Sequence, residues 1–187
     1  MNATILFVPG LRDHVEDHWQ THMARSLPGA VTVEPLTADR LSLDLRVATL
    51  DAALNAITGE VVIAAHSAGC LMVATWAKSP TRRIKGALLA TPVDVENPLP
   101  PGYPGIDELN ANGWLPVPRQ PLPFATIVAA SRNDPLAAWS TVEAFARDWG
   151  ATLYDAGAVG HLNPAAGFGP WPAASRLLET LANGVTN

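Results

Sequence analysis

Residues 60–78 read Glu60-Val-Val-Ile-Ala-Ala-His-Ser-Ala-Gly-Cys-Leu-Met-Val-Ala-Thr-Trp-Ala-Lys78. The part from Val61 to Ala65 is apolar throughout, which is typical of a strand buried on both faces of a sheet. The part from Cys70 onward consists mostly of good helix formers. We therefore expect a buried strand that turns through Ser67, between small neighbours, directly into a helix.

A sharp strand-to-helix turn through a serine is the nucleophile elbow of α/β-hydrolases. In that geometry the serine hydroxyl projects beyond the end of the sheet. The backbone N–H of Ala68, at the start of the helix, can donate to a developing oxyanion. The pattern departs from G-x-S-x-G because Ala65 replaces the first glycine. A serine after a strand can also be a simple helix N-cap, so the motif needs partners elsewhere in the chain.

The composition is that of a compact soluble protein, with 48% hydrophobic and 16% charged residues. Its 187 residues predict one domain over 1–187. The formal net charge of -5 argues against nucleic-acid and anionic-membrane partners. The single cysteine cannot form an internal disulfide. Because the N-terminus lacks a basic segment and Pro9 interrupts its apolar run, we expect no signal peptide, no membrane span and a cytoplasmic location.

Strand and helix patterns alternate along the whole chain. The predicted strands are residues 3–8, 30–34, 61–65, 84–90, 124–130 and 151–155. The predicted helices are residues 11–27, 43–57, 70–78, 139–149 and the segment that begins at 172. This alternation predicts a three-layer α/β fold of about six mainly parallel strands with helices on both faces. Residues 97–123 are rich in proline and lack a helical period, so we expect a long irregular connection over an active site.

Two downstream strand ends carry the partners that a nucleophilic serine needs. Asp134 follows the fifth strand and His161 the sixth, which gives the chain order of an α/β-hydrolase triad with Ser67. His161 would take the serine proton, and Asp134 would fix the imidazole tautomer and stabilise its charged form. Asp94 and Asp155 compete for the acid role. Asp94 lies one strand too early, and Asp155 is close to His161 in sequence.

A second oxyanion donor is expected in the loop after the first strand. We nominate the Leu11 N–H, with Gly10 giving the backbone room to turn. Loss of one such donor typically lowers kcat by about 10²–10³-fold. Because the base must be neutral to act, activity should rise with pH as the His161 imidazole loses its proton.

Several segments resemble the small serine hydrolases of the YdeN and retinoblastoma-binding-protein-nine type. They are Pro9-Gly10, His18-Trp19-Gln20, Ala65-His-Ser-Ala-Gly69, Asp134-Pro135 and Gly160-His-Leu-Asn-Pro-Ala-Ala-Gly-Phe-Gly-Pro-Trp-Pro172. The resemblance covers essentially the whole chain. It implies a compact α/β-hydrolase without a helical cap, and triad roles for Ser67, Asp134 and His161. Met23 departs from the pattern, since a second aromatic residue is expected there.

These residues predict a serine hydrolase without metal or cofactor, which transfers an acyl group from a small-molecule ester to Ser67 and then to water. Thioester or amide cleavage would use the same machinery. The apolar character of the proline-rich connection suggests small or medium acyl groups. The side chains that we expect to contact the substrate are His18, Trp19, Leu99, Tyr103 and Trp114.

Two further classes of function compete with this one. Because fold does not fix function, the chain could be a protein-binding module with residues 97–123 as an interaction arm. It could also be a metallohydrolase, since His14, His18 and His22 are four residues apart and would line one face of a helix, near Asp17. Against the latter, the stretch begins in a predicted loop and His18 belongs to the matching His-Trp-Gln segment.

Overall fold

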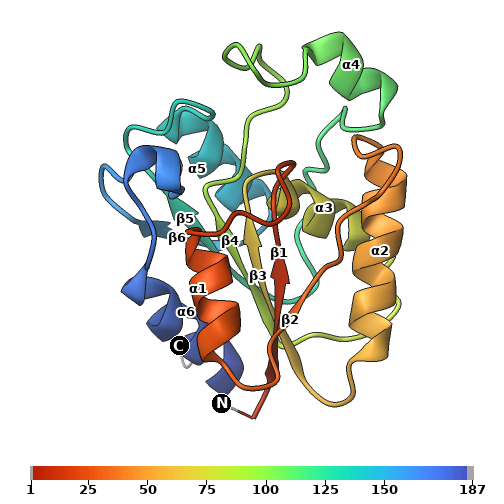
Figure 1. Ribbon diagram of the computed structural model, residues 1–187, viewed down its shortest axis with the longest axis vertical. Helices are drawn as coiled ribbons and strands as arrows, with labels where there is room; N and C mark the ends of the chain where they lie inside the picture. Colours follow the sequence, from red (N-terminus) through yellow and green to blue (C-terminus); the bar gives the residue numbers. More distant parts are fainter. Residues whose placement is uncertain (1, 185–187) are drawn as a thin grey trace.

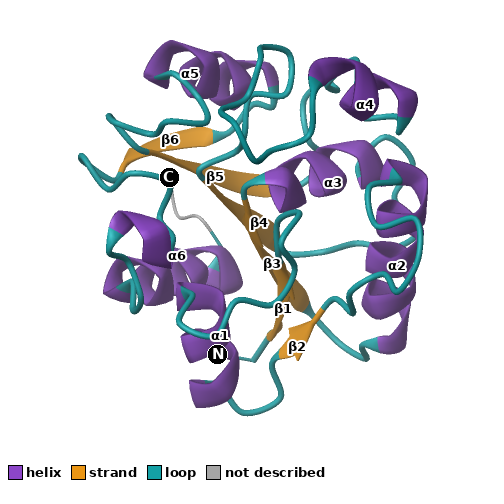
Figure 2. Ribbon diagram, turned by 45° about the horizontal axis from the view of Figure 1, so that its top comes forward, coloured by secondary structure: helices purple, strands orange, loops and turns teal. Residues whose placement is uncertain are grey.

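The computed structural model describes residues 2–184, which form a six-stranded sheet covered by helices on both faces (Figures 1 and 2). The strand order is β2-β1-β3-β4-β5-β6, and every neighbouring pair is parallel. The strands are β1 (Thr4–Val8), β2 (Val31–Thr32), β3 (Val61–His66), β4 (Gly86–Ala90), β5 (Ala125–Ala130) and β6 (Thr152–Asp155). The predicted three-layer parallel α/β fold is confirmed.

Each face of the sheet has its own helix layer (Figure 2). The helices are α1 (Trp19–Ser26) and α6 (Pro172–Asn183) on one face, and α2 (Leu43–Ala56), α3 (Ala68–Trp76) and α5 (Trp139–Asp148) on the other. Alternate residues of β1 point to opposite layers: Phe7 packs with α1 and α6, whereas Leu6 packs with α2 and α3. None of the helices in the described chain combines the length and apolarity needed to cross a bilayer.

The central strand β3 explains the position of the serine. All six of its residues are buried, and it pairs with β1 on one side and β4 on the other. Such a strand ends in the middle of the carboxyl edge of the sheet, where active sites of parallel α/β folds form. Ser67, directly after β3, therefore lies between the loops that follow β1 and β4.

Three predicted elements differ from the structure. The helix predicted over residues 11–27 begins only at Trp19, because His18 caps it by accepting a hydrogen bond from the Gln20 N–H at Nδ1 (3.3 Å). Strand β2 has two residues instead of five. The connection 97–123 contains a short helix, α4 (Ile106–Ala111). Its six residues bury only Leu109, so no helical period is visible in the sequence.

The proline-rich connection passes over the carboxyl ends of the strands, and α4 lies at that end of the molecule (Figure 1). The connection packs on the core through Leu109 and Trp114, which are both buried. In residues 2–184 no separate cap domain is evident, which agrees with the prediction of an uncapped hydrolase fold.

Candidate active site

The turn between β3 and α3 holds Ser67 in a backbone conformation that residues other than glycine rarely adopt. Its φ is 57° and its ψ is -125°, and such a conformation persists only where the surroundings fix it. The Ser67 N–H donates to the Ala90 carbonyl (3.0 Å), and the Cys70 N–H donates to the Ser67 carbonyl (3.0 Å). The elbow is therefore anchored to β4 on one side and to its own helix on the other.

Two glycines allow the backbone to pass close to the elbow. A Cβ added at Gly69 would lie 2.3 Å from the Val8 carbonyl oxygen, so α3 could not pack against the end of β1 with any side chain there. A Cβ at Gly10 would lie 3.1 Å from the Ser67 Cβ. The loop after β1 is thus in direct contact with the serine. Ala65, which replaces the first glycine of the motif, is fully buried, so its methyl group is accommodated in the core.

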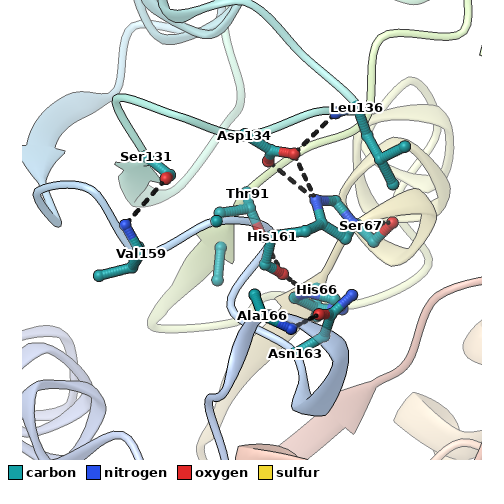
Figure 3. Close-up of polar contacts among 12 residues, drawn as sticks. His66, Ser67, Thr91, Ser131, Asp134, Leu136, Val159, His161, Asn163 and Ala166 are labelled. Carbon is teal, nitrogen blue, oxygen red and sulfur yellow. Dashed lines mark hydrogen bonds and ion pairs between the residues drawn. The ribbon is translucent and has the colours of Figure 1, made fainter. Parts of the chain in front are cut away.

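The structure brings Ser67, His161 and Asp134 together (Figure 3). The His161 Nε2 lies 2.9 Å from the Ser67 Oγ, and its Nδ1 lies 2.9 Å and 2.8 Å from the two Asp134 carboxylate oxygens. Because a carboxylate only accepts, Nδ1 carries the proton and Nε2 is free to accept from the serine hydroxyl. The His161 and Asp134 side chains are 5% and 1% exposed, so water is largely excluded from this contact.

The loop after β5 holds the loop that carries His161 (Figure 3). The Val159 N–H donates to Ser131 Oγ at 3.2 Å, and the Gly160 N–H donates to Asn133 Oδ1 at 2.7 Å. Asp134 is itself fixed by the Leu136 N–H, which donates to its Oδ1 at 2.8 Å. The segment Ser131–Asp134 therefore supplies both the carboxylate and the backbone support of the histidine.

His66, one residue before the serine, also holds His161. Its Nε2–H donates to the His161 carbonyl at 2.8 Å, and the Thr91 hydroxyl donates to the same oxygen at 3.4 Å. Burial, with smaller contributions from the positive charges that His161 and His18 can carry, holds the pKa of His66 well below its usual range. His66 is therefore a neutral ring that fixes the backbone of His161.

A cavity of about 150 Å³ opens beside Ser67 and His161. Its walls come from the loop after β1, the connection after β4 and the loop after β6. Besides Ser67 and His161, the residues that line it include Leu11, Arg12, Asp13, His18, Ala68, Val93, Val95, Leu99 and Tyr103. Three of the residues predicted to contact the substrate line this cavity: His18, Leu99 and Tyr103. Both residues predicted to supply the oxyanion donors, Leu11 and Ala68, line it as well.

Trp19 and Trp114 do not line this cavity. Trp19 is fully buried and packs edge-on against Trp171, with ring centroids 5.2 Å apart. Trp114 is 2% exposed, and its indole N–H donates to the Leu41 carbonyl at 2.7 Å. Both indoles fill space in the core, so the structure does not place them where the predicted substrate contacts would be.

His18 forms a neutral part of the cavity wall. Its ring lies 4.4 Å from that of His66, centroid to centroid. Burial is the main cause that lowers the pKa of His18 from 6.5 to about 4, with smaller effects of the charges on His161 and His22. Near neutral pH, His18 therefore adds no charge next to His161.

The competing acids have other partners. Asp94 accepts hydrogen bonds from Asn97 Nδ2 (2.9 Å) and the Thr141 hydroxyl (3.2 Å), and so stabilises a turn. Asp155 accepts from Arg132 Nε at 2.9 Å, and this hydrogen bond lowers the pKa of Asp155. Asp134 is the carboxylate that contacts His161.

The three histidines considered as metal ligands, His14, His18 and His22, are not arranged as a metal site requires. His14 lies before helix α1, with its Nε2 3.3 Å from Glu16 Oε2, whereas His18 caps the helix. The spacing by four residues therefore does not place His14, His18 and His22 on one helix face. Among residues 2–184, no three His, Cys, Asp or Glu side chains are placed to hold a metal ion.

The parallel sheet and the strained serine turn define a protein of the α/β-hydrolase class. A family model described as serine hydrolase matches residues 5–180. A YdeN-like hydrolase from Pectobacterium atrosepticum is 30% identical, with 97% of this chain and 91% of that chain covered and a TM-score of 0.80. The chain therefore belongs to the serine hydrolase family and, within it, to the YdeN-like hydrolases.

Two more distant structures share the fold. The ydeN gene product from B. subtilis is 17% identical, with 97% of this chain and 100% of that chain covered and a TM-score of 0.73. Est1E from Butyrivibrio proteoclasticus, solved with ferulic acid bound, is 14% identical, with 96% and 90% covered and a TM-score of 0.68. No curated protein matches the chain.

Proposed function

We propose that the protein is a carboxylesterase-like hydrolase that uses Ser67 as nucleophile, His161 as general base and acid, and Asp134 as the group that orients the histidine. The proposal rests above all on one observation, the unbroken contact from Ser67 Oγ through the His161 ring to the Asp134 carboxylate, at 2.9 Å and 2.8 Å. Burial of the ring and the carboxylate supports it further, because proton transfer along these contacts needs no solvent reorganisation.

In the acylation step, Ser67 Oγ attacks the ester carbonyl carbon. A C–O bond forms, the hydroxyl proton moves to His161 Nε2, and the carbonyl π electrons move to the oxygen. Asp134 stabilises the resulting imidazolium through Nδ1–H. When the intermediate collapses, the bond to the leaving oxygen breaks and the imidazolium gives it the proton, which leaves an acylated Ser67.

In the deacylation step, water replaces the alcohol. His161 Nε2 takes a proton from the water as its oxygen attacks the acyl carbon, and then returns this proton to Ser67 Oγ as that bond breaks. The carboxylic acid is released with the serine hydroxyl restored. No cofactor enters this cycle.

Two backbone N–H groups would stabilise the oxyanion, those of Ala68 and Leu11. Ala68 is the first residue of α3, and the N–H groups of the first helical turn have no partner within the helix. Leu11 lines the cavity, and its neighbour Gly10 packs against Ser67. Both features support an oxyanion hole between the two loops.

The cavity supports substrates with a small apolar acyl group. Val93, Val95, Leu99 and Tyr103 supply an apolar wall, and the volume is only about 150 Å³. A panel of p-nitrophenyl esters of increasing chain length tests this, and a thioester and an amide of the preferred acyl group test the bond type. We expect turnover to fall once the chain exceeds a medium length.

The reaction itself is tested by turnover of these esters by the wild type and by Ser67→Ala. Triad residues act as a unit, so the variant should lose about 10⁴–10⁶-fold in kcat. Ser79→Ala, an exposed serine just beyond α3, is the matched control and should retain full activity. Ester hydrolysis that survives Ser67→Ala would overturn the proposal, and a wild type inert toward every ester would favour a binding module.

A further inference from the structure

A buried ion pair lies beside the cavity. Arg46, on α2, is 4% exposed, and its Nη1 lies 2.9 Å from the carboxylate of Asp13, whose side chain is 7% exposed. Arg46 shares the buried face of α2 with Leu43, Leu50 and Leu54. Desolvation of two charges is unfavourable and is only partly offset by their attraction. Such a pair therefore needs a reason beyond the stability of the helix.

All three nitrogens of the Arg46 guanidinium donate hydrogen bonds, and both oxygens of the Asp13 carboxylate accept them. The Arg46 Nε donates to the Arg40 carbonyl at 2.6 Å, and its Nη2 donates to the Leu11 carbonyl at 3.3 Å. The second oxygen of Asp13 accepts from Arg40 Nη2 at 2.6 Å. The guanidinium thus connects α2 to the backbone of the loop after β1, at the residue next to the elbow contact of Gly10.

Asp13 closes the same loop from its other end. Its N–H donates to the Gly10 carbonyl at 3.0 Å, and its φ of 54° places it in the left-handed region. In a trans peptide the N–H points away from the C=O. Fixing the Gly10 carbonyl toward Asp13 therefore directs the Leu11 N–H to the opposite side. Arg46 fixes the next carbonyl, that of Leu11, so both peptide groups that flank the Leu11 Cα are held.

We infer that Asp13 and Arg46 are positioning residues, which hold the Leu11 N–H in the direction that stabilises the oxyanion formed on attack by Ser67. The inference rests on the proposed function and assigns a role to a pair that does not touch the reacting atoms. An oxyanion donor acts only when it lies about 2.7–3.1 Å from the oxygen. Because Asp13 neutralises Arg46, the pair contributes orientation rather than net charge.

Two variants test the inference. Arg46→Met removes the guanidinium and keeps an unbranched apolar side chain on the buried face of α2. Asp13→Asn removes the charge, and asparagine tolerates the left-handed backbone well, so this variant remains informative if Arg46→Met fails to fold. Each should lower kcat on a p-nitrophenyl ester by about 10–100-fold. This is less than the roughly 10²–10³-fold loss typical when an oxyanion donor is removed altogether, because the Leu11 N–H is displaced and not deleted. KM should change little.

Three readouts separate positioning from a merely structural role. The affinity for butylboronic acid, whose tetrahedral adduct on Ser67 resembles the intermediate, should fall by the same factor as kcat. The pH dependence of kcat/KM should stay where it is in the wild type, since His161 and Asp134 are untouched. Ethylguanidinium added to a third variant, Arg46→Ala, should restore part of kcat by occupying the space that the guanidinium left.

Arg82→Met is the matched control. The Arg82 guanidinium also binds backbone carbonyls of α2 and of the residues that follow it, those of Leu54, Ile57 and Gly59, but it does so at the far end of that helix. The Arg82→Met variant should have a lower free energy of unfolding than the wild type and an unchanged kcat. Wild-type kcat in folded Arg46→Met or Asp13→Asn, with an active wild type, would overturn the inference alone. A wild type without esterase activity would overturn the proposed function and the inference with it.

Discussion

The cavity has two unlike walls. The polar wall, formed by Gly10, Asp13, His18, Ser67 and His161, consists of residues held by hydrogen bonds, either within their own segment or to neighbouring strands, helices and loops. The apolar wall, formed by Val93, Val95, Leu99 and Tyr103, packs on the core around α3 and α4.

Four of the five non-glycine residues that have positive φ in residues 2–184 lie in or next to the polar wall, and the fifth, Asp39, lies in the loop before α2. Ser67 and Asp13 adopt a left-handed backbone, as do Thr91 and Leu162 beside the histidine loop. Strain of this kind survives only where several bonds oppose it. The difference teaches that orientation is fixed on one side of the substrate and size on the other, so changes on each side should have separable effects.

The largest effect is expected for His161→Ala, which removes the base from the polar wall. We expect kcat to fall by about 10⁴–10⁶-fold, because the serine hydroxyl then has no proton acceptor. Adding Ser67→Ala to this variant should cost almost nothing more. Multiplicative losses in the double variant, measured as kcat on one ester, would show that the two residues do not act as a unit.

A slightly smaller effect is expected for Asp134→Asn. The amide can donate to Nδ1 and thereby favour the wrong tautomer of His161, so kcat should fall by about 10⁴-fold. Asp94→Asn is the control, since Asp94 also follows a strand but binds Asn97 and Thr141. Equal losses in the two variants, in the same steady-state assay, would contradict the assignment of the acid.

The third prediction concerns stability and pH. Unfolded His18 takes up a proton below pH 6.5, whereas burial keeps the folded ring neutral down to about 4. The unfolded state thus binds more protons in this window, and the free energy of unfolding falls as the pH is lowered through it. Protonation of unfolded His18 should lower the free energy of unfolding by about 3 kcal/mol as the pH falls through this window.

His18→Asn tests this prediction, because asparagine keeps the helix N-cap and does not titrate. Denaturant unfolding at pH 7 and pH 4 should show a smaller fall in the free energy of unfolding for the variant than for the wild type. His66 contributes in the same direction in both proteins. Parallel falls would show that His18 is not held neutral by the fold.

The smallest effect is expected on the apolar wall. Leu99→Ala should raise kcat/KM for a medium-length ester relative to acetate by about 10-fold, the usual size of such an apolar contact. The pH profile should not move, because the polar wall is intact. Leu45→Ala, at a leucine of α2 that is 44% exposed, is the control. An unchanged chain-length profile would place the acyl group elsewhere.

Patterns local in sequence pointed to Gly10, His18, Ser67 and His161 of the polar wall, but not to Asp13. The apolar run of β3 followed by small residues located Ser67, and the strand ends located Asp134 and His161, because parallel strands all end at one edge. Local patterns could not show the support. The carbonyl bound by His66 lies 95 residues away, and the carboxylate bound by Arg46 lies 33 residues away. An arginine within the apolar stripe of α2 was the one available signal.

The apolar wall was harder to predict. Leu99 and Tyr103 line the cavity, whereas Trp114, from the same connection, turns inward and donates to Leu41. Which aromatic residue points outward depends on how the proline-rich connection packs, and that packing has no period in the sequence. Trp19 was misplaced for a related reason, since it follows the cap residue His18 and so begins the buried face of α1.

The most direct measurement is covalent labelling of the wild type by a fluorophosphonate, followed by intact-mass analysis and peptide mapping. We predict a single adduct on the Ser67 peptide, slowed strongly by Asp134→Asn and by His161→Ala, and lost in Ser67→Ala. No adduct on folded protein, or an adduct on a residue other than Ser67, would contradict the assignment of the nucleophile.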